Sequence, residues 1–239
     1  LDFLVGGFTN LTQDHLDYHG DMEQYFAAKR RLFTDYNSGT ALVNSADPYG
    51  QRLADEFAAQ TVGDSPTADL FIEIVKLAQA QSLFRVNGVE FSMPLIGRHN
   101  VANAALALGM VRALGVTLED CVKPLASVTP VPGRLEPIVE GQPFAVYVDY
   151  AHTDDALRQV LSTLREITPG QLRVVFGCGG NRDAGKRQKM GAVAATMADA
   201  VMITTDNPRR EDPAAIADQI AVGCASVEGA HWQIELDRE

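Results

Sequence analysis

Strand-like and helix-like segments alternate along the second half of the chain, and this order restricts the fold more than any other feature of the sequence. The predicted strands are residues 144–149, 172–176 and 201–205, and the predicted helices are residues 153–167, 187–198 and 213–227. Strand–helix alternation is typical of a parallel sheet with right-handed crossover connections. We therefore predict an α/β domain in which ligands bind at the carboxyl ends of the strands.

The first half of the chain has the pattern of a separate α/β domain. Expected strands cover residues 1–8, 40–44 and 70–77, expected helices cover 21–36, 101–114 and 117–127, and a hairpin joins 82–86 to 89–93. The hairpin is predicted from Asn87-Gly88, because this pair favours tight two-residue turns. Two prolines and a glycine in residues 130–133 make the best linker. We therefore predict two domains, over residues 1–132 and 133–239.

Composition excludes several classes of function. Hydrophobic residues make up 46% of the chain, which is too many for a disordered protein. The 20 Lys and Arg residues against 31 Asp and Glu residues give a net charge of −11, which disfavours nucleic acid and anionic membranes as partners. Since no run of about 18 uncharged apolar residues is present, we expect no membrane insertion. Three widely spaced cysteines, Cys121, Cys178 and Cys224, are typical of thiols in a reducing cytoplasm.

A glycine-rich segment follows the predicted strand 172–176. Residues 180–187 have the glycine spacing of a phosphate-binding loop, with Lys186 directly after the second glycine. Arg187 stands where such a loop needs a Ser or Thr to bind magnesium. Two interpretations remain open: a nucleotide loop, or an anion pocket in which Arg182 binds a carboxylate at a helix N-terminus.

A second polar segment, from Asp206 to Arg209, follows the predicted strand 201–205. Asn207-Pro208 favours a turn, so the segment could be a turn with no further role. The functional interpretation is that Pro208 holds Arg209 rigidly, so that its guanidinium can pair with a carboxylate.

Residue types that bind divalent cations gather in the loop before the predicted helix 21–36. They are Asp14, His15, Asp17 and His19. Magnesium prefers oxygen ligands, although a loop of this composition can also be simply solvated. Lys29 fills a gap in the apolar stripe of the helix, where desolvation of a charged amine is costly, so its tip must either reach water or have a function. If the amine is desolvated, it is partly neutral and nucleophilic. Such an amine could react with carbon dioxide, giving a carbamate whose oxygens bind a metal.

Further positions could contact a nucleotide. Asp149 ends a predicted strand and could accept a hydrogen bond from a ribose hydroxyl. Asn100 and Asn103 lie one helical turn apart at the start of the predicted helix 101–114. The simpler interpretation is helix capping for Asn100 and an ordinary polar face for Asn103.

Taken together, these segments resemble the Mur ligase family. The matching segments are residues 10–20, 27–29, 97–105, 133–136, 149–153, 177–187 and 206–209. They follow one another in the family's order and cover most of the chain. Residues 206–209 resemble the form found in members that add meso-diaminopimelate. The resemblance implies part of a P-loop-type central ATP-binding domain, followed by part of a Rossmann-like C-terminal domain.

The resemblance also implies a reaction, an ATP-dependent amide ligation of cytoplasmic peptidoglycan synthesis. ATP would phosphorylate the D-glutamate carboxylate of UDP-N-acetylmuramoyl-L-alanyl-D-glutamate. The amine of meso-diaminopimelate would then attack the acyl phosphate, and an amide, ADP and phosphate would form. ATP and Mg²⁺ are the implied cofactors, and the full-length enzyme is expected to be a monomer.

Roles for individual residues follow from the same resemblance. Lys29, as a carbamate, would bind magnesium together with His15. Asn103 would lie near adenine, Arg134 near the phosphates and Asp149 at the ribose. The residues expected to bind diaminopimelate are His152, Arg182, Asn207 and Arg209. A bidentate arginine at the distal carboxylate would discriminate against lysine, whose side chain ends in an ammonium.

Several parts of the family pattern are not found between Leu1 and Glu239: the P-loop, the N-terminal domain and the last strands of the C-terminal domain. We therefore expect a fragment that does not hydrolyse ATP by itself. Asn181 stands where the family usually has Asp, and Asp154 where Pro is common. The alternatives are another Mur or folylpolyglutamate-type ligase and a non-catalytic binding module. A plain dinucleotide-binding domain is disfavoured, because the glycine pattern that starts at Gly177 is incomplete.

Overall fold

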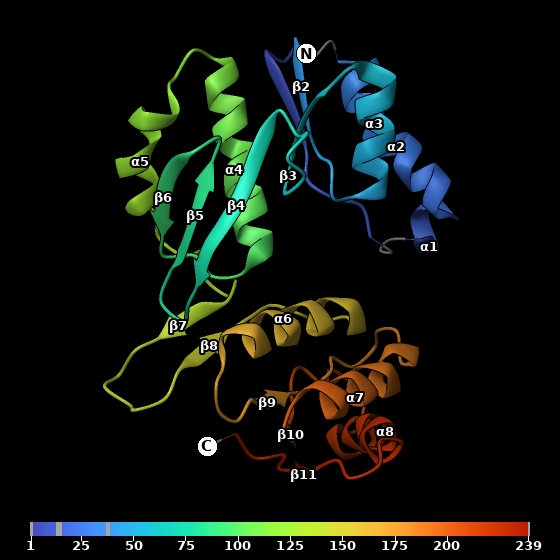
Figure 1. The fold of residues 1–239 in the computed structure, drawn as a ribbon. Helices are drawn as coiled ribbons and strands as arrows, with labels where there is room; N and C mark the ends of the chain where they lie inside the picture. The colour runs from blue at the N-terminus through green and yellow to red at the C-terminus, as the bar shows by residue number, and fades with distance from the viewer. Residues whose placement is uncertain (1, 13–15, 37–38, 239) are drawn as a thin grey trace. The chain divides into compact units, whose positions relative to one another are not determined.

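The computed structural model describes residues 2–12, 16–36 and 39–238. The chain forms two compact units, Leu1–Thr129 and Pro130–Glu239, and each unit is described by itself (Figure 1). Within the described residues, no helix has the length and apolar character needed to cross a bilayer.

In the described part of the first unit, the elements are β1 (Val5–Phe8), α1 (Leu16–His19), α2 (Met22–Thr34), β2 (Thr40–Asn44), α3 (Pro48–Phe57), β3 (Gln60–Gly63), β4 (Leu70–Leu77), β5 (Ser82–Val86), β6 (Val89–Met93), α4 (Arg98–Ala113) and α5 (Leu118–Ala126). Those of the second unit are β7 (Glu136–Ile138), β8 (Val146–Val148), α6 (Asp154–Ile167), β9 (Arg173–Phe176), α7 (Gly185–Met197), β10 (Ala200–Ile203), α8 (Pro213–Ala225) and β11 (Trp232–Ile234).

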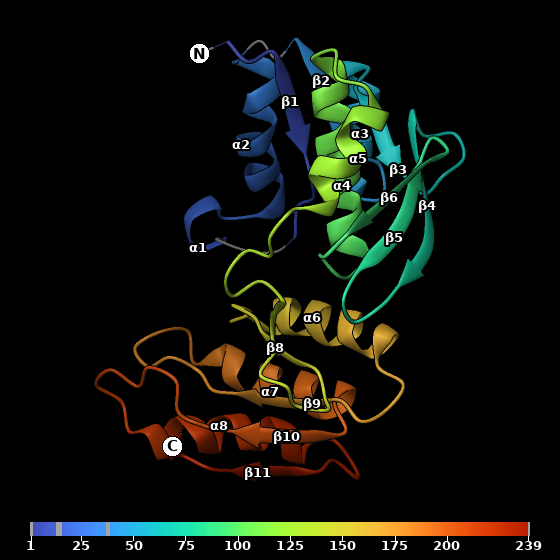
Figure 2. The same cartoon turned by 90° about the vertical axis from the view of Figure 1, so that its left-hand side faces the viewer.

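One sheet runs through the first unit in the order β1-β2-β3-β4-β5-β6 (Figure 2). The strands from β1 to β4 pair in parallel, whereas β4, β5 and β6 pair antiparallel. The predicted hairpin is confirmed. Asn87 and Gly88 connect β5 to β6 with φ angles of 48° and 85°, the left-handed conformation that a tight hairpin turn of this kind requires.

Helices cover both faces of this sheet, because successive residues of a strand point to opposite sides. Leu42 of β2 packs in a core with residues of α4 and with the aromatic pair Phe84 and Phe91. Its neighbour Val43 packs in a second core, which includes Phe26 of α2 and residues of α3. The first unit is therefore a three-layer α/β structure.

Helix α3 and strand β3 were not predicted from the sequence. The signal was present, since Asp47 occupies the N-cap of α3 and Pro48 its first turn, a common way for a helix to begin. Asp47 accepts hydrogen bonds through Oδ1 from the amides of Tyr49 and Gly50, at 2.9 and 3.0 Å. Its Oδ2 accepts a third bond, at 3.0 Å, from the amide of Leu11 in the segment that follows β1.

A parallel sheet in the order β11-β10-β9 forms the second unit, as the strand–helix alternation predicts. Residues 144–149 contain a strand, as predicted, but the prediction that this strand belongs to the parallel sheet is wrong. Within that segment, β8 pairs antiparallel with β7 in a separate two-stranded sheet. A short loop joins the two strands, so this local pairing closes at a low entropic cost.

Helices α7 and α8 pack closely through small residues. A Cβ atom on Gly191 of α7 would lie 2.1 Å from the carbonyl oxygen of Ile220 in α8. Likewise, a Cβ atom on Gly223 of α8 would lie 2.0 Å from the carbonyl oxygen of Gln188 in α7. Only glycine allows the two backbones to come this near, and the close contact fixes how the loops before the two helices lie.

Candidate functional site

Two loops meet at the carboxyl ends of β9 and β10. The loop 177–184 leads from β9 to α7, and the loop 204–212 leads from β10 to α8. The amide of Gly180 donates to the carbonyl of Asn207 at 2.8 Å, and Nη1 of Arg209 donates to the carbonyl of Gly180. A Cβ atom on Gly180 would lie 1.9 Å from the carbonyl oxygen of Pro208, so the loops are in backbone contact.

An ion pair between a buried arginine and a half-buried glutamate adjoins this contact. The side chain of Arg187, in the first turn of α7, is only 1% exposed. Its Nη1 donates to Oε2 of Glu211 at 2.8 Å and to Oε1 of Gln219 at 2.9 Å. Its Nη2 donates to Oε1 of Glu211 at 3.0 Å and to the carbonyl of Gly179 at 3.3 Å. This pair was not predicted, because nothing in the spacing of Arg187 and Glu211 shows that the two residues meet.

Glu211 also joins the loops through the backbone. Its Oε1 accepts a hydrogen bond from the amide of Asn181, and Oδ1 of Asn181 accepts one from the amide of Arg210 at 3.1 Å. Asn181 and Arg209 both have positive φ, 50° and 53°, and asparagine tolerates this conformation better than most residues. The hydrogen bonds from Arg187 and from the Asn181 amide keep the pKa of Glu211 below its ordinary value.

The predicted carboxylate-binding residues lie on these two loops with exposed side chains. Arg182 is on the first loop, and Asn207 and Arg209 are on the second. Arg182 makes no side-chain hydrogen bond or ion pair within the described residues. The first amide of α7, that of Gly185, already binds Oδ1 of Asp183 at 2.8 Å. An anion held here would therefore depend on the arginines more than on the end of the helix.

Asp149, at the end of β8, holds a third loop in place. Its Oδ2 accepts from the amide of Leu135 at 2.9 Å and its Oδ1 from that of Ala151 at 2.8 Å. A carboxylate oxygen has two lone pairs, so both atoms keep capacity for a further donor. The guanidinium of Arg134 lies over the ring of Tyr150, 5.3 Å from its centroid, and its side chain is exposed.

His152 connects this third loop to the start of α7. Its carbonyl accepts a hydrogen bond from Nζ of Lys186 at 2.7 Å, and its Nδ1 lies 3.1 Å from the carbonyl oxygen of Tyr150. The lysine of the glycine-rich segment is thus bound to protein backbone. The structure brings His152, Arg182, Asn207 and Arg209 onto neighbouring loops of one unit.

Lys29 lies on α2 of the first unit, and its side chain is exposed. The predicted inward placement is therefore wrong, and of the two outcomes left open the tip reaches water. The buried side of α2 carries Phe26 and Phe33, and Arg30 lies between them. Nζ of Lys29 is 5.4 Å from the ring centroid of Tyr25, on which the ring of His19 stacks at 4.4 Å. Lys29 therefore adjoins the end of the Asp- and His-rich segment.

The predicted partner His15 and its neighbour Asp14 lie outside the described residues. Among the residues that are described, no three His, Cys, Asp or Glu side chains gather in a way that would hold a metal. Asn103 is exposed on α4. The capping role expected for Asn100 is wrong, since Gly97 is the N-cap of α4 and the side-chain Nδ2 of Asn100 donates to the carbonyl of Ile96 at 2.8 Å.

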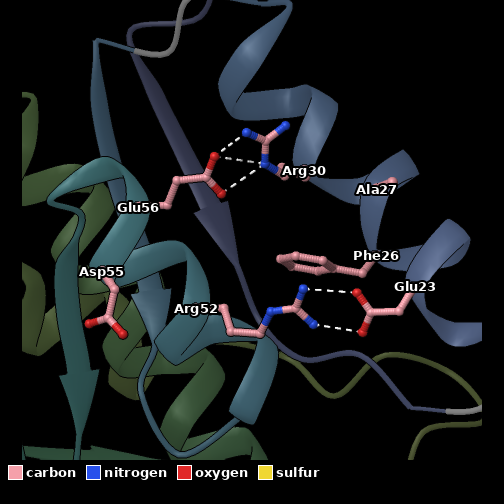
Figure 3. A pocket seen from close by; sticks show the side chains of 7 residues that line it. All are labelled: Glu23, Phe26, Ala27, Arg30, Arg52, Asp55 and Glu56. Atoms are coloured by element: carbon pink, nitrogen blue, oxygen red, sulfur yellow. Dashed lines mark hydrogen bonds and ion pairs between the residues drawn. The ribbon is translucent and has the colours of Figure 1, made fainter.

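A groove of about 620 Å³ lies between α2 and α3 (Figure 3). Arg52 donates to both oxygens of Glu23 at 2.7 and 2.8 Å, and Arg30 pairs with Glu56. The guanidinium of Arg52 also lies 4.3 Å from the ring centroid of Phe26. The two arginines that line the groove are thus each paired with a glutamate, and these ion pairs fix α2, the helix that carries Lys29, on α3.

Comparison with known proteins agrees with this arrangement. A family model described as the Mur ligase middle domain matches residues 1–111, and one described as the Mur ligase glutamate ligase domain matches residues 133–239. The chain belongs to the Mur ligase family. The resemblance read from the motifs and the predicted α/β class are confirmed.

Similar curated proteins carry one name, UDP-N-acetylmuramoyl-L-alanyl-D-glutamate–2,6-diaminopimelate ligase. The protein of Thermosynechococcus vestitus is 46% identical over 238 residues, which cover 92% of this chain and 46% of that protein. The protein of Solibacter usitatus is 43% identical over 248 residues, which cover all of this chain and 50% of that protein. The chain spans about half the length of the curated relatives it matches.

Solved structures give the same result. A structure of a UDP-N-acetylmuramoyl-L-alanyl-D-glutamate–2,6-diaminopimelate ligase matches 98% of this chain and 50% of its own, with a TM-score of 0.67 and 34% identity. MurF from Acinetobacter baumannii matches 97% of this chain and 50% of its own, with a TM-score of 0.74 and 21% identity. At that identity, the second likeness concerns the fold alone.

Proposed function

We propose that this chain supplies part of the active site of an ATP-dependent ligase that joins meso-diaminopimelate to UDP-N-acetylmuramoyl-L-alanyl-D-glutamate. The observation that carries the proposal is the pair of joined loops in the second unit. They present Arg182, Asn207 and Arg209, while the cation beneath them, Arg187, is already neutralised by Glu211. The relatives named for this reaction are 46% and 43% identical to the chain.

The amino acid substrate fits the chemistry of these loops. Diaminopimelate has two carboxylates, each of which can accept two parallel hydrogen bonds from a guanidinium. Arg182 and Arg209 would bind carboxylate, and Asn207 and His152 would orient the amino groups. Lysine has only one carboxylate, so an arginine reserved for the distal carboxylate favours diaminopimelate. Residues 133–239 thus form the amino-acid-binding domain in this proposal.

Residues 1–132 would contribute to the nucleotide side. Asn103 on α4 would contact adenine. The second unit would also contribute to nucleotide binding, with Asp149 at the ribose and Arg134 at the phosphates. Lys29, as a carbamate formed from its exposed amine and carbon dioxide, would bind magnesium together with His15. When bound, magnesium supplies neutralisation of the phosphate charge.

The chemistry requires charge neutralisation and positioning more than covalent participation of the protein. The D-glutamate carboxylate attacks the γ-phosphorus of ATP, and ADP leaves. The amine of diaminopimelate then attacks the carbonyl carbon of the acyl phosphate, loses a proton and expels phosphate, which leaves the amide. The loops of the second unit hold the diaminopimelate so that its amine meets this carbon.

The test is amide formation by the full-length product of the gene that encodes these residues. UDP-N-acetylmuramoyl-dipeptide, ATP and magnesium are mixed with either meso-diaminopimelate or L-lysine, and the ligated product is measured by mass spectrometry. We expect product with diaminopimelate and little with lysine. Comparable product with lysine, or none with either amino acid, would contradict the proposal.

A matched pair of variants tests the role of the arginine. Arg209→Lys keeps the charge and loses the planar fork, so the KM for diaminopimelate should rise on the order of 10- to 100-fold. Arg210→Lys makes the same change at the exposed neighbouring position and should leave this KM unchanged. An equal effect of both variants would remove Arg209 from the binding site.

A further inference from the structure

We propose that Arg187 and Glu211 are positioning residues for the diaminopimelate site, which fix the two substrate-binding loops to each other. This inference rests on the proposed function, because it assigns the pair to the amino acid and not to the nucleotide. Neither residue touches the substrate in this proposal. Each acts through the loop residues that do, Arg182 on one side and Arg209 on the other.

The first support is the number of backbone groups that depend on the pair. Glu211 lies on the loop 204–212 and accepts a hydrogen bond from the amide of Asn181 on the loop 177–184. Arg187, at the start of α7, donates to the carbonyl of Gly179 on its own loop and to both oxygens of Glu211 on the other. Asn181 and Gly179 flank Gly180, whose carbonyl binds Arg209. The pair therefore adjoins the point where the loops cross.

Burial makes this arrangement unusually dependent on Glu211. The side chain of Arg187 is 1% exposed, and its Nε is buried with no hydrogen-bond partner among the described residues. Glu211 is the only acidic group paired with it in that part of the chain. A buried guanidinium that loses its carboxylate must either move or leave the interior, since an unpaired buried charge is strongly unfavourable. Either movement displaces the Gly179 carbonyl and the loop attached to it.

The charges of Arg187 and Glu211 indicate that the pair positions the loops and does not bind the substrate. Its two charges cancel, so it offers no net attraction to an incoming phosphate or carboxylate. Lys186, which directly precedes Arg187, is bound to the carbonyl of His152. The remaining cations on the two loops include Arg182 and Arg209, whose side chains are exposed. Because Glu211 neutralises Arg187, the carboxylates of the substrate are left to the exposed arginines.

The kinetic test uses the full-length gene product with Glu211→Gln and Arg187→Met, singly and together. Each single variant should raise the KM for diaminopimelate on the order of 10- to 100-fold, because small misplacement of a binding group has effects of that size. The KM for ATP should stay within about twofold of the wild-type value. The double variant should be no worse than either single variant, since the two residues act as one unit.

Controls separate this role from general loss of structure. Glu228→Gln removes an exposed carboxylate of the same unit and should leave every constant unchanged. Arg187→Lys keeps the charge but cannot bind Glu211 through two nitrogens, so it should restore only part of the affinity for diaminopimelate. If Glu211→Gln leaves the KM for diaminopimelate unchanged, or raises the KM for ATP equally, the inference is overturned.

A second measurement does not depend on activity. Hydrogen exchange at the amides of Gly180 and Asn181 is measured in the 239-residue chain, with and without Glu211→Gln. We expect faster exchange at both amides in the variant, while amides of α6 keep the wild-type rate. If the wild-type enzyme fails to use diaminopimelate, the proposed function fails, and exchange still decides whether the pair fixes the loops. Unchanged exchange at both amides would refute the positioning role.

Discussion

Asp47 is a single carboxylate that holds two separate pieces of backbone. One oxygen caps α3 through Tyr49 and Gly50, and the other binds the amide of Leu11. Leu11 is itself buried, so no water replaces this bond if the carboxylate is removed. The cap of α3 and the beginning of the segment that leads towards His15 therefore depend on one side chain.

Replacing this carboxylate should destabilise the first unit. For Asp47→Ala we expect the free energy of unfolding to fall by about 2–4 kcal/mol, from about 1 for the lost cap and about 1–3 for the unpaired buried amide. Urea denaturation measures the change. Asp64→Ala, at an exposed position, is the control and should stay within about 0.5 kcal/mol of wild type. A loss below about 0.5 kcal/mol in Asp47→Ala would show that the cap and the long-range bond are replaceable.

For single residues, the sequence predicted which ones belong to the candidate site better than it predicted their burial and their contacts. Arg182 and Arg209 were found because each follows a predicted strand, and the topology brings such positions together. The predicted inward placement of Lys29 was wrong, because helical spacing alone does not say whether a residue at the edge of an apolar stripe faces the core or the solvent. Arg187 and Glu211 were missed as a pair, since they lie 24 residues apart and meet only through the packing of two loops.

Among the elements, local signals were the most reliable. The pair Asn87-Gly88 correctly predicted its hairpin, because the turn conformation is a property of those two residues. Helix α6 was predicted over 153–167 and observed over Asp154–Ile167. The pairing of β8 was wrong, since pairing is decided by loop closure and by neighbours that a single strand's pattern does not contain. The close packing of α7 on α8 was likewise not visible as periodicity.

That packing leads to a prediction for Gly223. In Gly223→Ala the new Cβ would lie 2.0 Å from the carbonyl oxygen of Gln188, so the two helices must separate. We expect the free energy of unfolding to fall by about 1–3 kcal/mol, the usual cost of overpacking. Gly170→Ala is the control, because its Cβ would meet nothing within 4 Å. Urea denaturation distinguishes the two variants, and equal stabilities would mean that α7 and α8 have room to adjust.

On the scale of the whole molecule, the chain contains two compact units, and each unit has buried apolar residues of its own. Leu42, Phe84 and Phe91 lie in a core of the first unit, and Leu161 and Ile220 are buried in the second. Composition and alternation predicted the α/β class of both units. The side-chain contacts within each unit join segments that are distant in the sequence, so no single stretch of sequence predicts them.

Because each unit is compact by itself, we expect a core mutation in one unit to destabilise that unit and to leave the other unchanged. Leu42→Ala should destabilise the first unit by about 2–5 kcal/mol through lost burial and a cavity. Hydrogen exchange should then speed up at protected amides of residues 1–129 and stay at the wild-type rate at those of 130–239. Ile220→Ala is the reciprocal variant and should affect only the second unit. Faster exchange in both units of either variant would mean that they unfold as one.

The ion pair at the start of α7 also bears on inhibitor design. The glycine-rich loop does bind an anion, but the chain supplies that anion itself, as the carboxylate of Glu211. A phosphate mimic aimed at Arg187 would compete with a tethered group whose local concentration no free compound reaches. Under the proposed function, a compound with two carboxylates at the spacing of diaminopimelate would bind the exposed arginines of the two loops, where it meets no such competitor.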